Sequence, residues 1–573
     1  MLRKAALLAL ICLISSMGYA QSAVLAEKPP GYAVASAHPL ATQAGLEILA
    51  AGGNAFDAAV AVSAALAVVE PYHSGLGGGG FWLLHNAGTK ENIVVDGREV
   101  APLAASQDMF LDKNGDPVPG LSLNGGLAAG IPGEPAALVY IAGHYGRLPL
   151  SASLAPAIRL AEQGFLVDEQ FIYFCQMMDR LEILKRYPAS SASYLNNGKV
   201  YKPGERLRQP DLAKTLKRLA EQGQKGFYQG ETAQQLVKGN RDAGGIWTLN
   251  DLARYQVKIR EPLQGAYHNM LIITVPPPSA GGTMLIMMLN MLANYPLTTF
   301  SRVQYVHYLV EVMRLAFWQS NQTMADPGFV KIPLSKLLSA GYAKGLTHLI
   351  NPDKATPSSK LSTAPMPAGA GNTTHIAILD QEGNRVSATM SVNYIFGSGV
   401  VAAGTGVLLN DHMDDFAVKP GVKNVFGVVG SQLNAIAPGK RPLSNMTPTF
   451  LEMPGRLAIV GTPGGSRIPT MVLLASLWFN DYSGAITMVS GMRFHHQYLP
   501  DVIQFEPDTF SDGLQTQLRA MGYQLMALKQ YYGDMQAISW DKKLNVITAA
   551  SDPRRMGLAT VVSVNPEGYG VNH

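Results

Sequence analysis

The sequence predicts an α/β protein in which helices and strands pack around a large core. Residues 39–51 and 55–69 are rich in Ala and Leu and place apolar side chains at helical spacing. Residues 385–393 alternate between apolar and small polar side chains, which is typical of a strand. Hydrophobic residues make up 47% of the 573 positions and charged residues only 15%, so the chain is globular rather than disordered.

The first twenty residues have the pattern of an export signal. Arg3 and Lys4 form a basic start, residues 5–17 are a largely apolar run, and Ala20 ends a Gly-Tyr-Ala stretch that suits signal peptidase. The run is too short for a comfortable membrane span, although an uncleaved anchor is the alternative. We therefore expect residues 1–20 to be removed and the protein to be exported, either to a periplasm or out of the cell.

The mature chain is expected to have little net charge and a single cysteine. Removal of residues 1–20 takes away two basic residues and no acidic one, which leaves 43 basic and 41 acidic side chains. This balance does not favour a nucleic-acid-binding protein. Only Cys175 remains, so no internal disulfide can form, and oxidation in an export compartment does not hold this fold together.

The two N-terminal helical segments lead into a glycine-rich stretch. The second segment, 55–69, is apolar nearly all round, which indicates a buried helix, and Asp57 suits its N-terminus because the helix dipole favours a carboxylate there. HSGLGGGG at 73–80 follows. Such glycines can cradle a phosphate, but no Lys-Ser or Lys-Thr pair follows and a strand comes next. Close packing of backbone against backbone is therefore the preferred interpretation.

Helical patterns dominate the middle of the chain, and strand patterns dominate the part after residue 373. Residues 151–260 are mostly helical, and 304–319 form a strongly amphipathic helix. Residues 352–371 are rich in Pro, Ser, Gly and Ala without periodicity, which predicts an exposed, flexible segment. Strands then alternate with glycine-rich turns until about Thr470, where another helix begins.

A strand pair follows the segment that was predicted to be flexible. Residues 374–379 are apolar after their start, which predicts a buried strand, and a Gln-Glu-Gly-Asn turn joins them to the alternating strand. A count outward from the turn places Thr373 opposite Val392, to within one or two residues. Thr373 then lies beside Ser391 and Asn393 on the polar side of the pair, so three small polar groups converge at the strand ends.

Two interpretations of Thr373 are open on the pattern alone. Threonine starts strands well, which needs no chemistry. Alternatively, a cut after Asn372 would make Thr373 the first residue of a second chain. Its own α-amine would then lie close to its own hydroxyl and act as the general base, as in N-terminal threonine nucleophiles. An unperturbed α-amine titrates at about 7.7–8.0, close to working pH.

Nine motifs occur in order between about residues 33 and 559, nearly the whole mature chain. They are GGNAFDAAVA at Gly52, EPYHSGLGGGGF at Glu70, DGREVAP at Asp96, PPPSAGG at Pro276, NTTH at Asn372, LLNDHMDDF at Leu408, KRPLSNMTPT at Lys440, GTPGGSRI at Gly461 and SDPR at Ser551. This set resembles the γ-glutamyltransferases (γ-glutamyl transpeptidases), which are N-terminal-nucleophile hydrolases. The resemblance implies a precursor that cuts itself between Asn372 and Thr373. The large subunit (21–372) and the small subunit (373–573) are then expected to form one intertwined domain, a four-layer αββα sandwich.

The resemblance also assigns catalytic and substrate-binding roles. Thr373 is the expected nucleophile, and the backbone N–H groups of Gly464 and Gly465 are expected to form an oxyanion hole. Glycine lets the backbone approach the developing oxyanion, and the loss of such a donor typically costs about 2.7–4 kcal/mol. Arg98 is expected to hold the substrate α-carboxylate with two parallel hydrogen bonds, and Asp415 is expected to hold the substrate ammonium.

Several matching positions depart from the family pattern. Ser391 replaces the usual Thr but keeps a hydroxyl, and together with Asn393 it is expected to hold the nucleophile and the substrate. Ser444 and Asn445 stand where many members have two serines that bind the carboxylate, and an Asn amide can still donate a hydrogen bond. These departures bear on donor preference more than on the reaction class.

Two further departures concern a substrate ligand and a lid. His412 replaces a Gln or Glu that helps to bind the substrate amine, and Phe426 replaces a lid Tyr, so a hydroxyl is missing there. A neutral His accepts a hydrogen bond from an ammonium, whereas a protonated His repels it. A packed or solvent-facing His412 that points away from the site is the alternative.

The expected function is that of an exported, self-processing γ-glutamyltransferase. The resemblance implies glutathione and related γ-glutamyl compounds as donors, and water, amino acids or peptides as acceptors. No cofactor and no catalytic metal are expected, since His495 and His496 are adjacent rather than at metal-ligand spacing. The alternatives are a related acylase for glutaryl-cephalosporin-type amides, a poly-γ-glutamate depolymerase, and a non-catalytic secreted binding protein.

Overall fold

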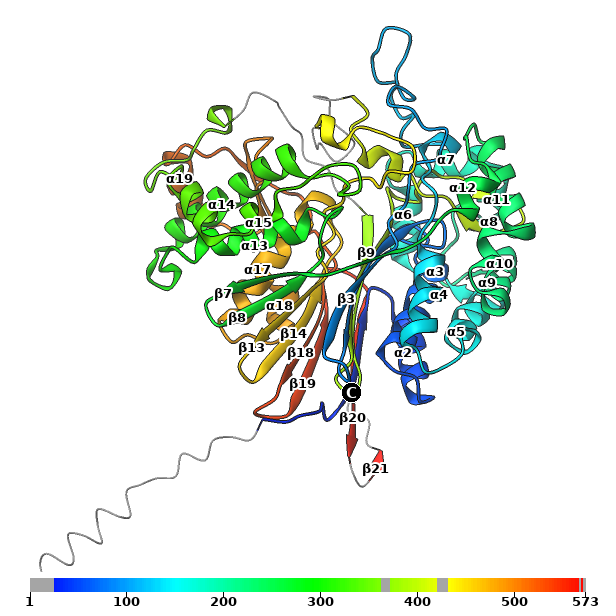
Figure 1. The fold of residues 1–573 in the computed structure, drawn as a ribbon, viewed down its shortest axis with the longest axis horizontal. Helices are drawn as coiled ribbons and strands as arrows, with labels where there is room; N and C mark the ends of the chain where they lie inside the picture. The colour runs from blue at the N-terminus through cyan, green and yellow to red at the C-terminus, as the bar shows by residue number, and fades with distance from the viewer. Residues whose placement is uncertain (1–24, 362–371, 420–430, 566–567, 570–573) are drawn as a thin grey trace, which may run out of the picture.

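Two antiparallel β-sheets lie face to face at the centre of the computed structural model, and helices cover the outer face of each sheet (Figure 1). This arrangement confirms the expected four-layer αββα sandwich. The structure describes residues 25–361, 372–419, 431–565 and 568–569. The expected signal at residues 1–20 and Phe426 of the expected lid lie outside the described residues.

The first sheet has eight strands in the order β21-β20-β1-β9-β10-β2-β3-β6. Their bounds are β1 (Gly31–Ser36), β2 (Gly79–Asn86), β3 (Glu91–Asp96), β6 (Lys258–Arg260), β9 (Asn372–Leu379), β10 (Arg385–Asn393), β20 (Leu558–Asn565) and β21 (Gly568–Tyr569). The hairpin expected after residue 373 is β9–β10, and it occupies the middle of this sheet between β1 and β2. The strand that begins next to Thr373 is thus paired on both sides.

The second sheet has six strands in the order β19-β18-β14-β13-β8-β7. Their bounds are β7 (Leu263–Tyr267), β8 (Met270–Thr274), β13 (Thr449–Met453), β14 (Arg456–Gly461), β18 (Gln536–Asp541) and β19 (Val546–Ser551). Short strands complete the described structure: β4 (Phe165–Leu166), β5 (Arg206–Leu207), β11 (Val401–Ala402), β12 (Val407–Leu408), β15 (Phe494–His495), β16 (Ile503–Phe505) and β17 (Leu525–Ala527). Both sheets combine strands from before and after Thr373.

One helical layer covers the first sheet and comes from the N-terminal part of the chain. It contains α2 (Pro39–Ala50), α3 (Ala55–Val69), α4 (Glu134–Tyr145), α5 (Leu150–Gln163), α6 (Glu169–Gln176), α7 (Arg180–Arg186), α8 (Pro188–Tyr194), α9 (Pro210–Gln222), α10 (Lys225–Tyr228), α11 (Gly230–Asp242) and α12 (Leu249–Ala253). Every residue of α3 is buried, as its apolar pattern predicts. Asp57 forms a capping box with Asn54 at the N-terminus of α3, which confirms the role expected for that carboxylate.

The other helical layer covers the second sheet and comes from later segments. It contains α13 (Gly281–Leu292), α14 (Arg302–Thr323), α15 (Leu334–Leu337), α16 (Ala340–Thr347), α17 (Ile468–Asn480), α18 (Ala485–Ser490) and α19 (Asp512–Ala520). The amphipathic helix expected at 304–319 is α14, and the helix expected from about Thr470 is α17. No helix within the described ranges combines the length and the apolar character that a membrane crossing needs.

The polar face of β10 is buried between the two sheets rather than turned to solvent. Val386, Ala388 and Met390 pack into the core under the first helical layer, as the alternation predicts. On the other face, the Ser387 hydroxyl donates to the Val460 carbonyl at 3.2 Å and accepts the Thr449 N–H at 3.1 Å. Hydrogen bonds to the second sheet therefore offset the cost of burying these small polar groups.

The glycines of HSGLGGGG allow backbones to approach closely. A Cβ atom on Gly77 would lie 1.8 Å from the Leu408 carbonyl oxygen, and one on Gly80 would lie 2.3 Å from the Thr389 carbonyl oxygen. The stretch continues directly into β2. The structural interpretation is confirmed for Gly77 and Gly80, because a side chain on Gly80 would push β2 away from β10 and one on Gly77 would collide with the Leu408 carbonyl.

The segment at 352–371 is only partly described, and its described residues are exposed or partly exposed with one exception. Ser358 is fully buried rather than exposed. Its N–H donates to Asp501 at 2.7 Å, and its hydroxyl donates to the Tyr498 carbonyl at 2.6 Å. These hydrogen bonds anchor the chain shortly before Thr373 on the segment between β15 and β16. Composition alone does not reveal such a buried hydrogen-bond partner.

Candidate active site

A cavity of about 50 Å³, here called the donor cavity, brings together nearly all the residues predicted to act on substrate. It is lined by Arg98, Thr373, Ser391, Asn393, His412, Asp415, Leu443, Ser444, Asn445, Met446, Gly465, Ser466 and Ile468. Gly464 is the one residue of the predicted set that lies outside this lining, and it lines a neighbouring cavity. Segments that are hundreds of residues apart therefore meet around Thr373.

Thr373 lies at the start of β9 and is 5% exposed. Thr374 pairs with Met390, so the observed register differs by one residue from the count outward from the turn. A β-bulge then shifts the register by one residue, and Asn372 pairs with Asn393. The Thr373 hydroxyl donates to the Ser391 hydroxyl oxygen at 3.4 Å. The expected convergence of small polar groups at the strand ends is confirmed.

Asn393 ends β10 in a left-handed backbone conformation, with φ of +80°. Its side-chain amide donates to the Asp411 carbonyl at 3.1 Å and to the Asp411 carboxyl group at 3.3 Å. Burial, together with the nearby Asp414 and Asp415, raises the pKa of Asp411 well above its ordinary range. Sequence reasoning missed Asp411, although it stands next to His412 in the LLNDHMDDF motif.

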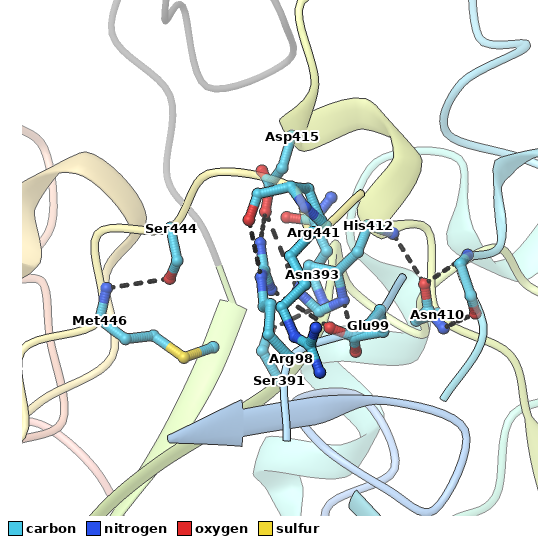
Figure 2. Close-up of polar contacts among 12 residues, drawn as sticks. Arg98, Glu99, Ser391, Asn393, Asn410, His412, Asp415, Arg441, Ser444 and Met446 are labelled. Atoms are coloured by element: carbon cyan, nitrogen blue, oxygen red, sulfur yellow. Dashed lines mark hydrogen bonds and ion pairs between the residues drawn. The ribbon is translucent and has the colours of Figure 1, made fainter. Parts of the chain in front are cut away.

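Arg98 and Asp415 form an ion pair with each other across the donor cavity (Figure 2). Arg98 is fully buried and also donates to the carbonyl oxygens of Pro442 at 3.3 Å and Leu443 at 3.1 Å. The sequence predicted these two residues as separate ligands for a carboxylate and an ammonium. In the structure each serves as the counter-ion of the other, so a zwitterion that binds here must replace one ion pair by two.

His412 stands between two carboxylates and faces the donor cavity (Figure 2). Its Nδ1 lies 2.9 Å from Glu99 Oε1, and its Nε2 lies 4.0 Å from Asp415 Oδ2. A neutral imidazole with its proton on Nδ1 would face Glu99 with the N–H and present the Nε2 lone pair toward Asp415. The alternative in which His412 points away from the site is wrong.

The Gly464–Gly465 turn follows β14 and opens the short helix η6 (Gly465–Arg467). Both glycines have positive φ, +140° and +58°, where other residues are strained. A Cβ atom on Gly464 would also lie 2.6 Å from the Met471 methyl carbon. Glycine is therefore favoured at both positions of this turn, and at Gly464 a larger side chain would also collide with Met471.

Ser444 and Asn445 line the same cavity from a segment held by the PPPSAGG motif. The Ser444 N–H donates to the Pro278 carbonyl at 2.9 Å, and the Ala280 N–H donates to the Ser444 carbonyl at 2.8 Å. The Ser444 hydroxyl accepts the Met446 N–H at 3.1 Å. The motif thus positions Ser444 through the backbone, and its own side chains are not part of the cavity wall.

Two further buried acids, Glu99 and Glu134, lie close to the site, and sequence reasoning missed both. Glu99 follows Arg98 directly in DGREVAP and contacts both Arg98 and His412. Glu134 is the first residue of α4 and is fully buried. Burial and the charge of Glu99 raise the pKa of Glu134 to about 8.

The substitution Glu134→Gln is expected to make the protein less sensitive to alkaline pH. Between its ordinary pKa of 4.5 and about 8, Glu134 keeps a proton in the folded state that it has lost in the unfolded chain. Its contribution to stability is therefore present below pH 4.5 and is lost as the pH rises through about 8. The melting temperature of Glu134→Gln relative to wild type should be at least about 2 °C higher at pH 9 than at pH 6. Equal differences at both pH values would contradict the assignment.

Comparison with known proteins identifies relatives over most of the chain. A sequence model of the family described as Gamma-glutamyltranspeptidase matches residues 41–562. A glutathione hydrolase proenzyme of Pseudomonas sp. (strain A14) is 40% identical over 493 residues, which cover 85% of each chain. The structure of a cephalosporin acylase from Bacillus halodurans is similar with a TM-score of 0.81 at 28% identity, covering 93% of this chain and 96% of that one. A chain of Helicobacter pylori gamma-glutamyltranspeptidase is 42% identical with a TM-score of 0.56, covering 57% of this chain and 94% of its own.

Proposed function

Since the chain belongs to the γ-glutamyltranspeptidase family, we propose that Thr373 is the nucleophile with which it transfers or hydrolyses γ-glutamyl groups. Its activity is that of a glutathione hydrolase, and glutathione is the natural donor to test first. The observation that carries the role of Thr373 is the donor cavity, in which its hydroxyl shares one wall with a guanidinium and a carboxylate. A γ-glutamyl group needs one ligand of each sign, because it carries both a carboxylate and an ammonium.

Donor binding exchanges the Arg98–Asp415 pair for two new ion pairs. The substrate α-carboxylate takes Arg98, with Ser444 and Asn445 as further hydrogen-bond donors, and the substrate ammonium takes Asp415. His412 accepts a second hydrogen bond from that ammonium through Nε2. The γ-carbonyl then lies over Thr373 because the two charged ends fix the other end of the glutamyl group.

The reaction runs through an acyl-enzyme. The α-amine of Thr373 takes the proton of the hydroxyl, Oγ1 attacks the γ-carbonyl carbon, and the oxyanion accepts hydrogen bonds from the N–H groups of Gly464 and Gly465. The C–N bond breaks and the leaving amine takes the proton from the α-amine. Water or an acceptor amine then attacks the ester, and the Thr373 hydroxyl is regenerated. Ser391 and Asn393 hold the nucleophile in place throughout.

Maturation supplies the α-amine that this mechanism uses. In the continuous chain the nitrogen of Thr373 belongs to the peptide bond with Asn372, so it cannot act as a base. We propose that Thr373 Oγ1 attacks the carbonyl carbon of Asn372, that the C–N bond breaks to free the α-amine, and that water then hydrolyses the resulting ester. The Thr373 hydroxyl is regenerated, and the products are a large subunit of 21–372 and a small subunit of 373–573. Export through the signal at 1–20 is part of the same proposal.

The acylase alternative is favoured by one observation, the high TM-score to the cephalosporin acylase. A glutaryl group has a carboxylate for Arg98 but no ammonium for Asp415. The two functions therefore differ in a measurable way. The purified mature protein should hydrolyse γ-glutamyl-p-nitroanilide and show two bands on a denaturing gel. Faster hydrolysis of the matching glutaryl anilide would instead support the acylase.

His412 is expected to make donor use sensitive to acid. Glu99, Asp415 and Arg98 are the charged groups around His412. Once protonated, His412 no longer accepts a hydrogen bond and repels the substrate ammonium. Donor kcat/KM should thus fall on acidification more steeply than the Thr373 amine alone requires. His412→Gln should remove the extra loss at acidic pH and keep the part of the pH profile that the Thr373 amine sets. Superimposable pH profiles for the two proteins would refute this role.

A further inference from the structure

A buried side-chain contact holds the residue that directly follows the proposed nucleophile. The Thr374 hydroxyl donates to Glu70 Oε2 at 3.0 Å, and both residues are fully buried. Glu70 comes directly after α3, and Thr374 lies near the start of β9. The contact thus links the first helical layer to the strand that carries Thr373, although neither Glu70 nor Thr374 lines the donor cavity.

Side chains from other positions hold the Glu70 carboxylate in place. The Gln170 amide of α6 donates to Glu70 Oε1 at 3.2 Å, and the Tyr72 hydroxyl donates to the same oxygen at 3.4 Å. His73 Nδ1 also lies 3.5 Å from Oε1. A buried carboxylate that accepts several hydrogen bonds has a fixed position, so Thr374 is bound to an acceptor that does not move freely.

The backbone of the same loop holds the neighbouring strand. The Val392 N–H donates to the His73 carbonyl at 3.1 Å. Val392 comes directly before Asn393, the last residue of β10. Residues 70–73 therefore contact both strands of the hairpin at the end where Thr373 lies.

Thr373 lies where the backbone of β9 has few other restraints. The pairing of β9 with β1 ends at Ile376. On the β10 side, Thr373 lies in the β-bulge between the pairs made by Asn372 and Thr374. A cut after Asn372 would also release Thr373 from the upstream chain. Thr374 would then be the nearest residue that both a strand pair and a buried hydrogen bond to another element hold in place.

We propose that Glu70 is a positioning residue, which holds Thr374 so that the α-amine and the hydroxyl of Thr373 stay aligned after the chain has been cut. This inference rests on the proposed function, because it requires a cut before Thr373. The uncut chain is tethered on both sides of Thr373, so the Glu70–Thr374 hydrogen bond matters little for self-processing. In the cut chain it restricts the free N-terminus, which reduces the entropy lost on reaching the reactive geometry.

Thr374→Val tests this role, because valine has a similar shape and lacks the hydroxyl. The mature variant should hydrolyse γ-glutamyl-p-nitroanilide with a roughly tenfold lower kcat, since formation and breakdown of the acyl-enzyme both use the Thr373 amine. KM should stay within about twofold of wild type, because the charged ligands of the donor are unchanged. Rates are expressed per small subunit measured on a denaturing gel, so that slow processing is not mistaken for slow catalysis. Thr374→Ser keeps the hydroxyl and should restore most of the kcat.

Thr215→Val is the matched control. Thr215 is fully buried in α9, its hydroxyl donates to the Thr405 carbonyl at 2.8 Å, and it does not line the donor cavity. This variant should lower the melting temperature about as much as Thr374→Val and leave kcat unchanged. Glu70→Gln is the second test variant, for use if Thr374→Val does not fold. It leaves one acceptor oxygen in place of two and should also lower kcat.

Three results would overturn the inference. One is an unchanged kcat in Thr374→Val and Glu70→Gln, and another is an equal fall in Thr215→Val, which would indicate a general effect of lower stability. The third is a fall in Thr374→Val that Thr374→Ser does not restore. A wild type that prefers the glutaryl anilide would instead contradict the proposed donor. The variants would then be compared with that substrate, because Glu70 acts on the nucleophile and not on the donor.

Discussion

Thr373→Ala is expected to yield a full-length chain without activity. The same hydroxyl is proposed to cut the bond after Asn372 and to attack the donor, so its removal abolishes both steps. The activity should fall by about 10⁴-fold or more, as for other removed nucleophiles. A denaturing gel should show one band for Thr373→Ala and two bands for wild type, and N-terminal sequencing of the smaller wild-type band should begin at Thr373.

Thr373→Ser is the matched control, because it keeps a hydroxyl at the same place beside Ser391. It should still cut itself, more slowly, and retain measurable hydrolysis. A Thr373→Ala chain that is cut at the same bond would refute self-processing by this residue. A small chain that begins elsewhere would show that the nucleophile has been assigned to the wrong position.

Asp415→Ala is expected to weaken γ-glutamyl donors strongly while the chain still processes itself. The substitution leaves the substrate ammonium without its carboxylate ligand, and it takes from the buried Arg98 one of its two carboxylate partners, so that Glu99 alone remains. Removal of one member of a buried pair typically costs about 3–5 kcal/mol, which corresponds to a roughly 150- to 5,000-fold fall in kcat/KM. Steady-state kinetics with γ-glutamyl-p-nitroanilide measures this effect.

Asp414→Asn is the matched control for Asp415→Ala. Asp414 accepts the Ser122 hydroxyl at 2.6 Å and does not line the donor cavity, so kcat/KM should change little. A glutaryl anilide provides the second comparison, because it has no ammonium to lose. Its hydrolysis should fall far less in Asp415→Ala than that of the γ-glutamyl anilide. An unchanged kcat/KM for the γ-glutamyl donor would favour the acylase function.

The local elements of the site could be predicted because each has its own sequence signal. The alternation at 385–393 defined β10, and the apolar run after Thr373 defined β9. The register was predictable to one residue, since the turn fixes the count outward, but the β-bulge beside Ser391 has no such signal. The buried position of Ser358 was also missed, because its hydrogen-bond partners lie far away in the chain and leave no local sequence signal.

By itself, the sequence determined the class of fold, the family and the residue types that the chemistry needs, since periodicity and motifs are properties of short stretches. Only the tertiary structure decided how those stretches meet. Arg98 and Asp415 are 317 residues apart, and nothing in either motif specifies that they pair. The packing of the sheets likewise decides that His412 lies between Glu99 and Asp415. It also forms the neighbouring cavity that Gly464 lines. Such contacts form between segments that share no local sequence pattern, so only the three-dimensional structure reveals them.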